Sequence, residues 1–102
     1  MEKLLLTDIE DRTLAMAEGD YVSFKIASRV LGIWCSRGVT YAELLSITGR
    51  LSRLGLIRWR IRDGHMNRFR NRAVWPTQGT HAAEFTATSA GLSHLEATRH
   101  VA

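Results

Sequence analysis

A block of arginines in the middle of the chain has the clearest chemistry in this sequence. Residues 50–72 contain eight arginines and a single acid, Asp63, so the segment carries a net charge of +7. The guanidinium group is a planar, permanently charged fork of N–H donors that matches the geometry of phosphate oxygens. A concentrated basic segment of this kind is the electrostatic footprint expected of a protein that binds nucleic acid.

The sequence offers little for catalysis or for a bound metal. It has no recognisable Ser/His/Asp arrangement, no glycine-rich phosphate loop and no pair of cysteines, so we expect neither an enzyme nor a cofactor. The single Cys35 lies in an apolar stretch, where cysteine behaves as a small hydrophobic residue. His81, His94 and His100 lack the spacing of metal ligands, and we therefore expect no metal site.

The rest of the chain differs from the arginine block in charge. The full chain of 102 residues has a formal net charge of +4, but residues 1–20 contain six acids and only two bases. The length and an ordinary hydrophobic content of 45% predict a single domain over residues 1–102. No apolar run approaches the roughly 20 residues of a membrane-spanning helix, and the N-terminus lacks a signal-peptide pattern. We therefore expect a cytoplasmic protein with no membrane partner.

Capping boxes mark the start of two helices. In residues 7–10 and 40–43, a threonine and a glutamate three residues apart can satisfy the first free amides of a helix. They predict helices over residues 7–18 and 41–54. The outer side of helix 41–54 is expected to carry Ser46, Gly49, Arg50 and Arg53, opposite Leu44, Leu45, Ile47, Leu51 and Leu54.

Two further helices are predicted from apolar periodicity. Residues 21–36 read as a helix that is apolar around most of its circumference and stops at Gly38, which is typical of a central core helix. Residues 89–99 form the last helix, with Thr88 or Ser89 as its cap. We expect a common core of Ile26, Val30, Trp34, Leu44, Leu51, Leu54, Trp59 and Leu95.

An arginine-rich β-hairpin is predicted before the last helix. Residues 58–62 alternate strictly between arginine and apolar residues, which is typical of a half-buried strand. Asp63-Gly64 is a strong turn signal, and the return strand is expected over residues 66–72. A third strand is expected over residues 81–87.

The register of this hairpin depends on the length of its turn. A two-residue Asp-Gly turn would mix Arg68 and Arg70 with Trp59 on one face. A three-residue loop over residues 62–64 separates apolar side chains from arginines, and we prefer it for that reason. It sets like charges opposite one another, a repulsion that a bound polyanion would neutralise. The face predicted to be basic carries Arg58, Arg60, Arg68, Arg70 and Arg72.

Two short motifs flank the hairpin. Residues 51–57 read LSRLGLI, a helix end that runs into a strand, and residues 88–95 read TSAGLSHL, a capped helix start. In their order and separation they resemble the winged helix-turn-helix domains of MarR-type and PadR-type regulators, over residues 22–97. The resemblance implies an α+β fold, a small winged-helix domain in which helices precede an arginine-rich β-hairpin wing and a C-terminal helix. Residues 1–20 would then form an additional acidic N-terminal helix.

The resemblance implies a DNA-binding protein, a small transcriptional regulator whose partner is double-stranded DNA. Helix 41–54 would enter the major groove, and the wing, residues 57–72, would contact the backbone or the adjacent minor groove. Arg50 and Arg53 are the expected base readers, because arginine paired with guanine is the commonest specific contact. The expected nucleic-acid-binding residues are Ser46, Gly49, Arg50, Arg53, Arg58, Arg60, Arg68, Arg70 and Arg72.

The same composition fits other classes of function. A protein-interaction module or inhibitor would use the basic wing or the acidic N-terminal helix to bind a nucleic-acid-handling protein. RNA binding is a third alternative, in which Trp59 and Phe69 would stack on bases if their face of the hairpin were exposed. A homodimer formed through helix 7–18 or helix 89–99 is a further alternative.

Overall fold

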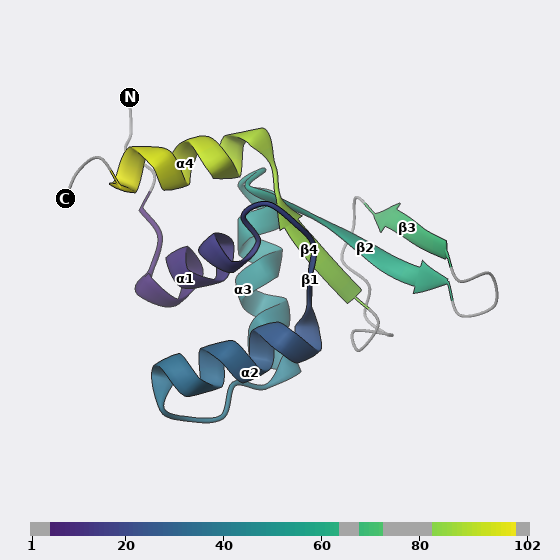
Figure 1. The fold of residues 1–102 in the computed structure, drawn as a ribbon, viewed down its shortest axis with the longest axis horizontal. Coiled ribbons are helices and arrows are strands. Elements are labelled where there is room, and N and C mark those ends of the chain that lie inside the picture. Colours follow the sequence, from purple (N-terminus) through teal and green to yellow (C-terminus); the bar gives the residue numbers. More distant parts are fainter. Residues whose placement is uncertain (1–4, 64–67, 73–82, 100–102) are drawn as a thin grey trace.

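The computed structural model describes residues 5–63, 68–72 and 83–99, with side chains over residues 5–60 and 83–99 (Figure 1). The described chain has an α+β fold with a four-stranded antiparallel sheet. Its elements are α1 (Asp8–Met16), β1 (Val22–Ser23), α2 (Phe24–Cys35), α3 (Tyr41–Arg53), β2 (Ile57–Asp63), β3 (Arg68–Arg72), β4 (Ala83–Ala87) and α4 (Ser89–Arg99). Among these described helices, none has the length and apolar character needed to span a membrane.

The capping box predicted at the start of α1 is confirmed. Thr7 Oγ1 accepts a hydrogen bond from the backbone N–H of Glu10 at 3.3 Å, and the Glu10 carboxylate accepts one from the backbone N–H of Thr7 at 2.9 Å. The helix ends at Met16, slightly before the predicted residue 18. Gly19 follows with a φ of +93°, a conformation that favours glycine and turns the chain toward β1.

A five-residue turn joins α2 to α3. Ser36, and not the predicted Gly38, takes the left-handed conformation that ends α2, with a φ of 56°. Thr40 caps α3 by accepting a hydrogen bond from the backbone N–H of Glu43 at 3.1 Å. The Glu43 side chain forms an ion pair with Arg37 at 2.7 Å. Only the threonine half of the second capping box is therefore observed.

The sheet places the last strand between two earlier ones. Its order is β1-β4-β2-β3, and all neighbouring strands are antiparallel. Alternation predicts β2 and β3, and a third strand is expected over residues 81–87, but the sequence does not predict that β4 pairs between β1 and β2. Figure 1 shows the helices gathered in one part of the molecule, with β2 and β3 extending away from them.

The register of β2 and β3 shows that the preferred prediction was wrong. Asp63 lies opposite Arg68, so four residues separate the strands, and Trp59 lies opposite Arg72. Opposite positions share a face of the sheet, so the arginine positions of β3 share a face with Trp59 and not with Arg58. Because β3 is an edge strand, the core does not fix its register in the way it fixes that of β2.

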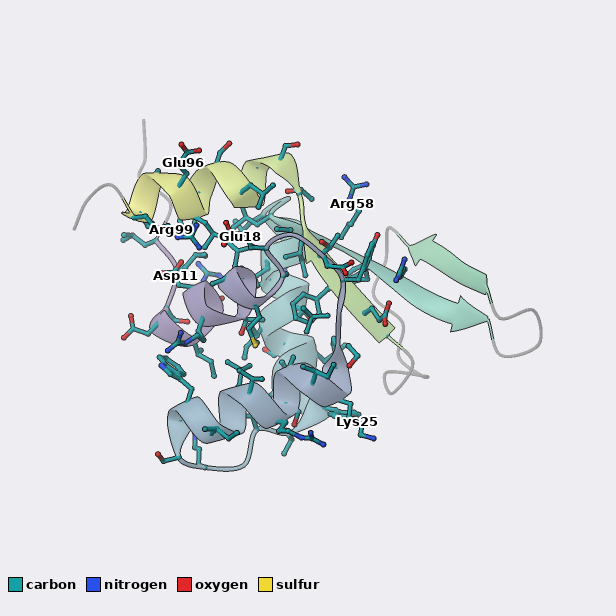
Figure 2. All side chains as sticks on the ribbon, viewed as in Figure 1. Asp11, Glu18, Lys25, Arg58, Glu96 and Arg99 are labelled. Atoms are coloured by element: carbon teal, nitrogen blue, oxygen red, sulfur yellow. The ribbon has the colours of Figure 1, made fainter. Side chains whose placement is uncertain are left out.

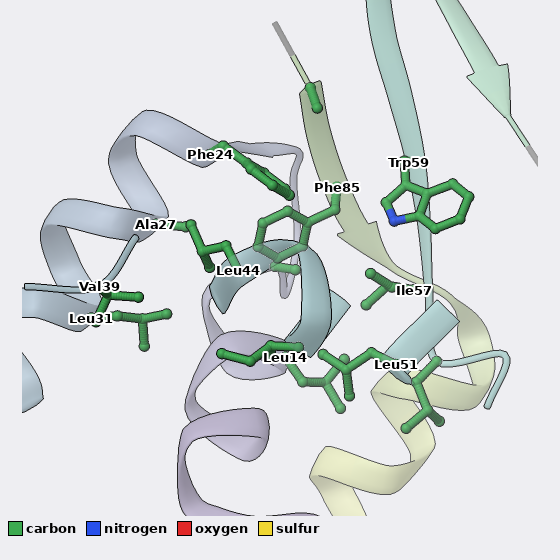
Figure 3. Close-up of a cluster of buried hydrophobic side chains, with 14 of the residues drawn as sticks. Leu14, Phe24, Ala27, Leu31, Val39, Leu44, Leu51, Ile57, Trp59 and Phe85 are labelled. Carbon is green, nitrogen blue, oxygen red and sulfur yellow. The ribbon is translucent and has the colours of Figure 1, made fainter. Parts of the chain in front are cut away.

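The core lies between the helices and the inner face of the sheet (Figure 3). Phe24 and Phe85 are its largest fully buried side chains, and their rings meet edge to face with centroids 6.0 Å apart. Burial confirms half of the predicted core, namely Leu44, Leu51, Trp59 and Leu95.

The helix α2 is not the central helix that its composition predicts. It has two apolar sides, and only the side with Phe24, Ala27 and Leu31 is buried. Because both sides of α2 are apolar, helical periodicity does not identify the side that faces the core. The residues wrongly predicted to be buried are Ile26, Val30, Trp34 and Leu54, which are 56%, 39%, 41% and 37% exposed.

Candidate nucleic-acid interface

The helix α3 presents a small polar face to solvent. Its opposite side is buried through Leu44, Ile47, Thr48 and Leu51. The helical period turns Ser46, Gly49 and Arg53 away from that side, and Ser46 and Arg53 are exposed. A Cβ at Gly49 would lie 3.5 Å from Arg53 Nη1, so the glycine leaves space beside the guanidinium group. This face carries one charged side chain among small residues, so another surface can approach it closely.

Arg50 is directed away from this face, toward α1. Its Nη1 forms an ion pair with Glu10, and its Nη2 donates a hydrogen bond to the carbonyl oxygen of Leu5 at 3.2 Å. The Glu10 side chain is only 7% exposed and also accepts a hydrogen bond from the Thr7 hydroxyl at 3.0 Å. Arg50 thus joins α3 to α1 and does not belong to the outer face of α3.

Burial and hydrogen bonding shift the pKa of Glu10 in opposite directions. Burial opposes ionisation, but the hydrogen bonds from Arg50 and Thr7 outweigh it and hold the pKa of Glu10 below its ordinary value. A hydrogen bond from Arg99 likewise lowers the pKa of Glu18. A carboxylate that is more acidic in the folded chain stabilises folding above the unfolded pKa. This stabilisation is lost as the pH falls through the folded pKa.

Glu10→Gln is expected to lower stability only where the carboxylate is ionised. Glutamine keeps a hydrogen-bonding group at this position but carries no charge for Arg50. The free energy of unfolding should fall by about 1–3 kcal/mol at pH 7, the value of a hydrogen bond to a charged group. The deficit should narrow below about pH 4, under the unfolded pKa of a glutamate. Urea unfolding of the variant and the wild type at pH 7 and pH 3 measures this difference in the free energy of unfolding. Equal differences at the two pH values would contradict the ion pair between Glu10 and Arg50.

The two arginines at the start of β2 have different surroundings. Trp59 is buried, so Arg58 and Arg60 on either side of it lie on the outward face of the sheet. Arg58 is exposed, and Figure 2 shows its side chain projecting clear of the ribbon. Arg60 is engaged, because its Nε donates to Glu84 at 2.8 Å and its guanidinium carbon lies 3.8 Å from the ring centroid of Tyr21.

The nine predicted site residues are therefore not all gathered on one described surface. Ser46, Gly49 and Arg53 share the outer face of α3, whereas Arg58 lies on the face of the sheet that points away from the core. The side chains of Arg68, Arg70 and Arg72, like that of Phe69, lie outside the described residues. Trp59 is 3% exposed, so its ring is not available for the base stacking considered for RNA.

Sequence reasoning missed two contacts that hold the elements around the α3 face together. The ion pair between Glu10 and Arg50 joins residues 40 positions apart, and no local pattern signals it. The contact between Gly91 and the carbonyl oxygen of Leu56 joins the two motifs that flank the hairpin. The signal for this contact was the order and separation of the two motifs along the chain.

The described residues also bear on metal binding. Within residues 5–63, 68–72 and 83–99, no three His, Cys, Asp or Glu residues are grouped to hold a metal ion. His94 Nε2 lies 3.1 Å from Asp11 Oδ1, and Cys35 is a free cysteine packed against the core.

Comparisons of the chain with family models, with curated proteins and with solved structures find no match.

Proposed function

We propose that this protein binds double-stranded DNA and places the outer face of α3 in the major groove. One observation carries the proposal: α3 follows α2 after a five-residue turn, is anchored by one side and leaves Ser46, Gly49 and Arg53 on the other. A helix of 13 residues is roughly 20 Å long, and the major groove, about 12 Å wide, admits an α-helix.

The order of the elements supports a winged helix-turn-helix interpretation. A helix and a short strand precede the pair α2 and α3, and β2 and β3 then extend beyond the helices (Figure 1). The motifs that suggested this family are also in contact. The Thr88 backbone N–H donates to the carbonyl oxygen of Leu56 at 2.9 Å, and the Thr88 hydroxyl donates to that of Gly55 at 2.6 Å.

Each residue on the α3 face has a distinct expected role. Among the described residues, Arg53 has no carboxylate partner, so its guanidinium is available for the O6 and N7 atoms of a guanine. Gly49 allows the helix backbone to approach the groove, and Ser46 can donate to a base or a phosphate. The arginines of the sheet other than Arg60, which pairs with Glu84, would neutralise phosphates and position the helix. Sequence-specific binding of this kind would suit a small transcriptional regulator.

Arg53→Ala is expected to weaken duplex binding without lowering stability. Loss of one good base contact costs about 1–3 kcal/mol, or roughly 5- to 150-fold in affinity at the preferred sequence. Fluorescence anisotropy, with a labelled duplex selected from a random library at low salt, measures the change, and a thermal melt checks the fold.

Arg99→Ala is the matched control for charge. It removes the same charge from the end of α4, where Arg99 forms an exposed ion pair with Glu18 that contributes little. Its affinity should stay close to that of the wild type. Equal losses in Arg53→Ala and Arg99→Ala would contradict the assigned surface, and undetectable duplex binding by the folded wild type would contradict DNA binding itself.

A further inference from the structure

An apolar stripe lies along the outer side of α2. Its four residues recur at positions i, i+4, i+7 and i+8, which places them on one side of the helix over two turns. Together they expose on the order of 400 Å², comparable with the largest apolar patch of a typical monomer, which is often functional. We call them the α2 surface: Ile26, Val30, Ile33 and Trp34, which are 56%, 39%, 76% and 41% exposed.

Basic residues border the α2 surface on both sides. Lys25 and Arg29 are exposed along one edge, and Figure 2 shows Lys25 near the end of the helix that follows β1. At the other edge, the guanidinium carbon of Arg12 lies 5.0 Å from the centroid of the Trp34 ring. Residues 21–42 contain no acid at all. The α2 surface is therefore an apolar strip with a positive border.

We propose that the α2 surface docks an acidic amphipathic helix of another protein. The apolar side of that helix would cover Ile33 and Trp34, and its carboxylates would pair with Lys25 and Arg29. The spacing i, i+4, i+7 is the one by which two helices interdigitate and by which helical partners are anchored. The inference does not depend on DNA binding, because none of these residues belongs to the α3 face.

Charge distinguishes this partner from the other ligands of an apolar helix face. A second copy docked through the same surface would bring Lys25 and Arg29 close to the basic border of its partner, and like charges at an interface are costly. DNA would satisfy the charges but leave the four apolar side chains in water.

Two designed peptides test the proposal on the full chain. Each is a fluorescein-labelled helix of about five turns, roughly 18 residues, with leucines at i, i+4, i+7 and i+11. One peptide carries glutamates on both flanks of the leucines, and the other carries lysines at the same positions. The acidic peptide should bind in fluorescence anisotropy, and the lysine peptide should bind at least about tenfold more weakly.

Substitutions on the α2 surface should change this binding in two separate ways. Ile33→Ser removes the most exposed side chain of the stripe and should weaken the acidic peptide about tenfold while the melting temperature is unchanged. Leu5→Ser is the matched control, since Leu5 is 72% exposed but lies outside α2. Arg29→Glu should weaken the acidic peptide and strengthen the lysine peptide.

Several results would overturn the proposal. One is equal binding of the two peptides, another is binding by neither, and a third is an acidic peptide unaffected by Ile33→Ser. A dimer in sedimentation equilibrium that Ile33→Ser dissociates would assign the α2 surface to a second copy of the chain. Binding to phosphatidylserine vesicles that is lost in Ile33→Ser would assign it to a membrane. Either assignment would replace the acidic helix as the partner.

Discussion

Gly91→Ala is expected to destabilise the protein by about 3 kcal/mol or more, the upper end of what overpacking a tight interior costs. A Cβ at this position would lie 2.2 Å from the carbonyl oxygen of Leu56 and 3.2 Å from Leu14 Cδ1. The Leu56 oxygen cannot move aside freely, because it accepts the Thr88 backbone N–H at 2.9 Å. The substitution must therefore displace the start of α4 from Leu56, the residue just before β2.

Thermal unfolding measures this effect directly. In a domain of this size 1 kcal/mol corresponds to about 4–8 °C, so the midpoint should fall by more than about 10 °C. Gly38→Ala is the matched control, because Gly38 is exposed and an added Cβ meets nothing within 4 Å. A midpoint for Gly91→Ala within a few degrees of the wild type would contradict the close contact between α4 and Leu56.

The elements that local chemistry specifies could be predicted from the sequence. Thr7 and Glu10 satisfy each other's backbone groups within one turn, so the start of α1 follows from two residues. Thr88 begins α4 in the same way, by accepting the backbone N–H of Gly91 at 3.1 Å. The alternation of residues 58–62 likewise predicts β2, in which Ile57 and Trp59 are buried.

The side of α2 that faces the core could not be predicted, because its sequence has two apolar sides. Phe24 is fully buried between Phe85 and Tyr41, whereas Ile33 is 76% exposed on the same helix. The choice between the two sides depends on which neighbours are available, and that is a property of the tertiary fold. The hairpin register was also predicted wrongly, since Asp63 pairs with Arg68 and four residues separate the two strands, more than the Asp-Gly signal indicates.

The candidate site could be predicted only as far as helix periodicity reaches. Periodicity places Arg50 and Arg53 on similar sides of α3, three residues apart. It contains no information about Glu10, which lies 40 residues earlier and pairs with one of the two arginines. An exposed arginine and one held by a buried carboxylate look alike in sequence, although the energy needed to move them onto DNA is different.

A fourfold rise in salt concentration is expected to weaken duplex binding about 150-fold. Arg50 and Arg60 are held by Glu10 and Glu84, so we do not count them as phosphate ligands. Four phosphate contacts would give a slope of about −3.6 in log affinity against log salt, at about −0.9 per contact. Any four of these five arginines would supply these contacts: Arg53, Arg58, Arg68, Arg70 and Arg72. A slope near zero would show that these arginines do not contact DNA.

Arg53→Ala and Arg50→Ala form a matched pair that separates binding from folding. Arg53→Ala should flatten the salt slope by up to about one unit if the guanidinium also contacts phosphate, with stability unchanged. Arg50→Ala should leave the slope unchanged and lower the free energy of unfolding by about 1–2 kcal/mol, because Glu10 loses its charged partner in a buried position. The two measurements, salt titration and urea unfolding, are made on the same two proteins. A flattened slope in Arg50→Ala would mean that DNA draws this arginine away from Glu10, and the junction between α1 and α3 would then belong to the interface.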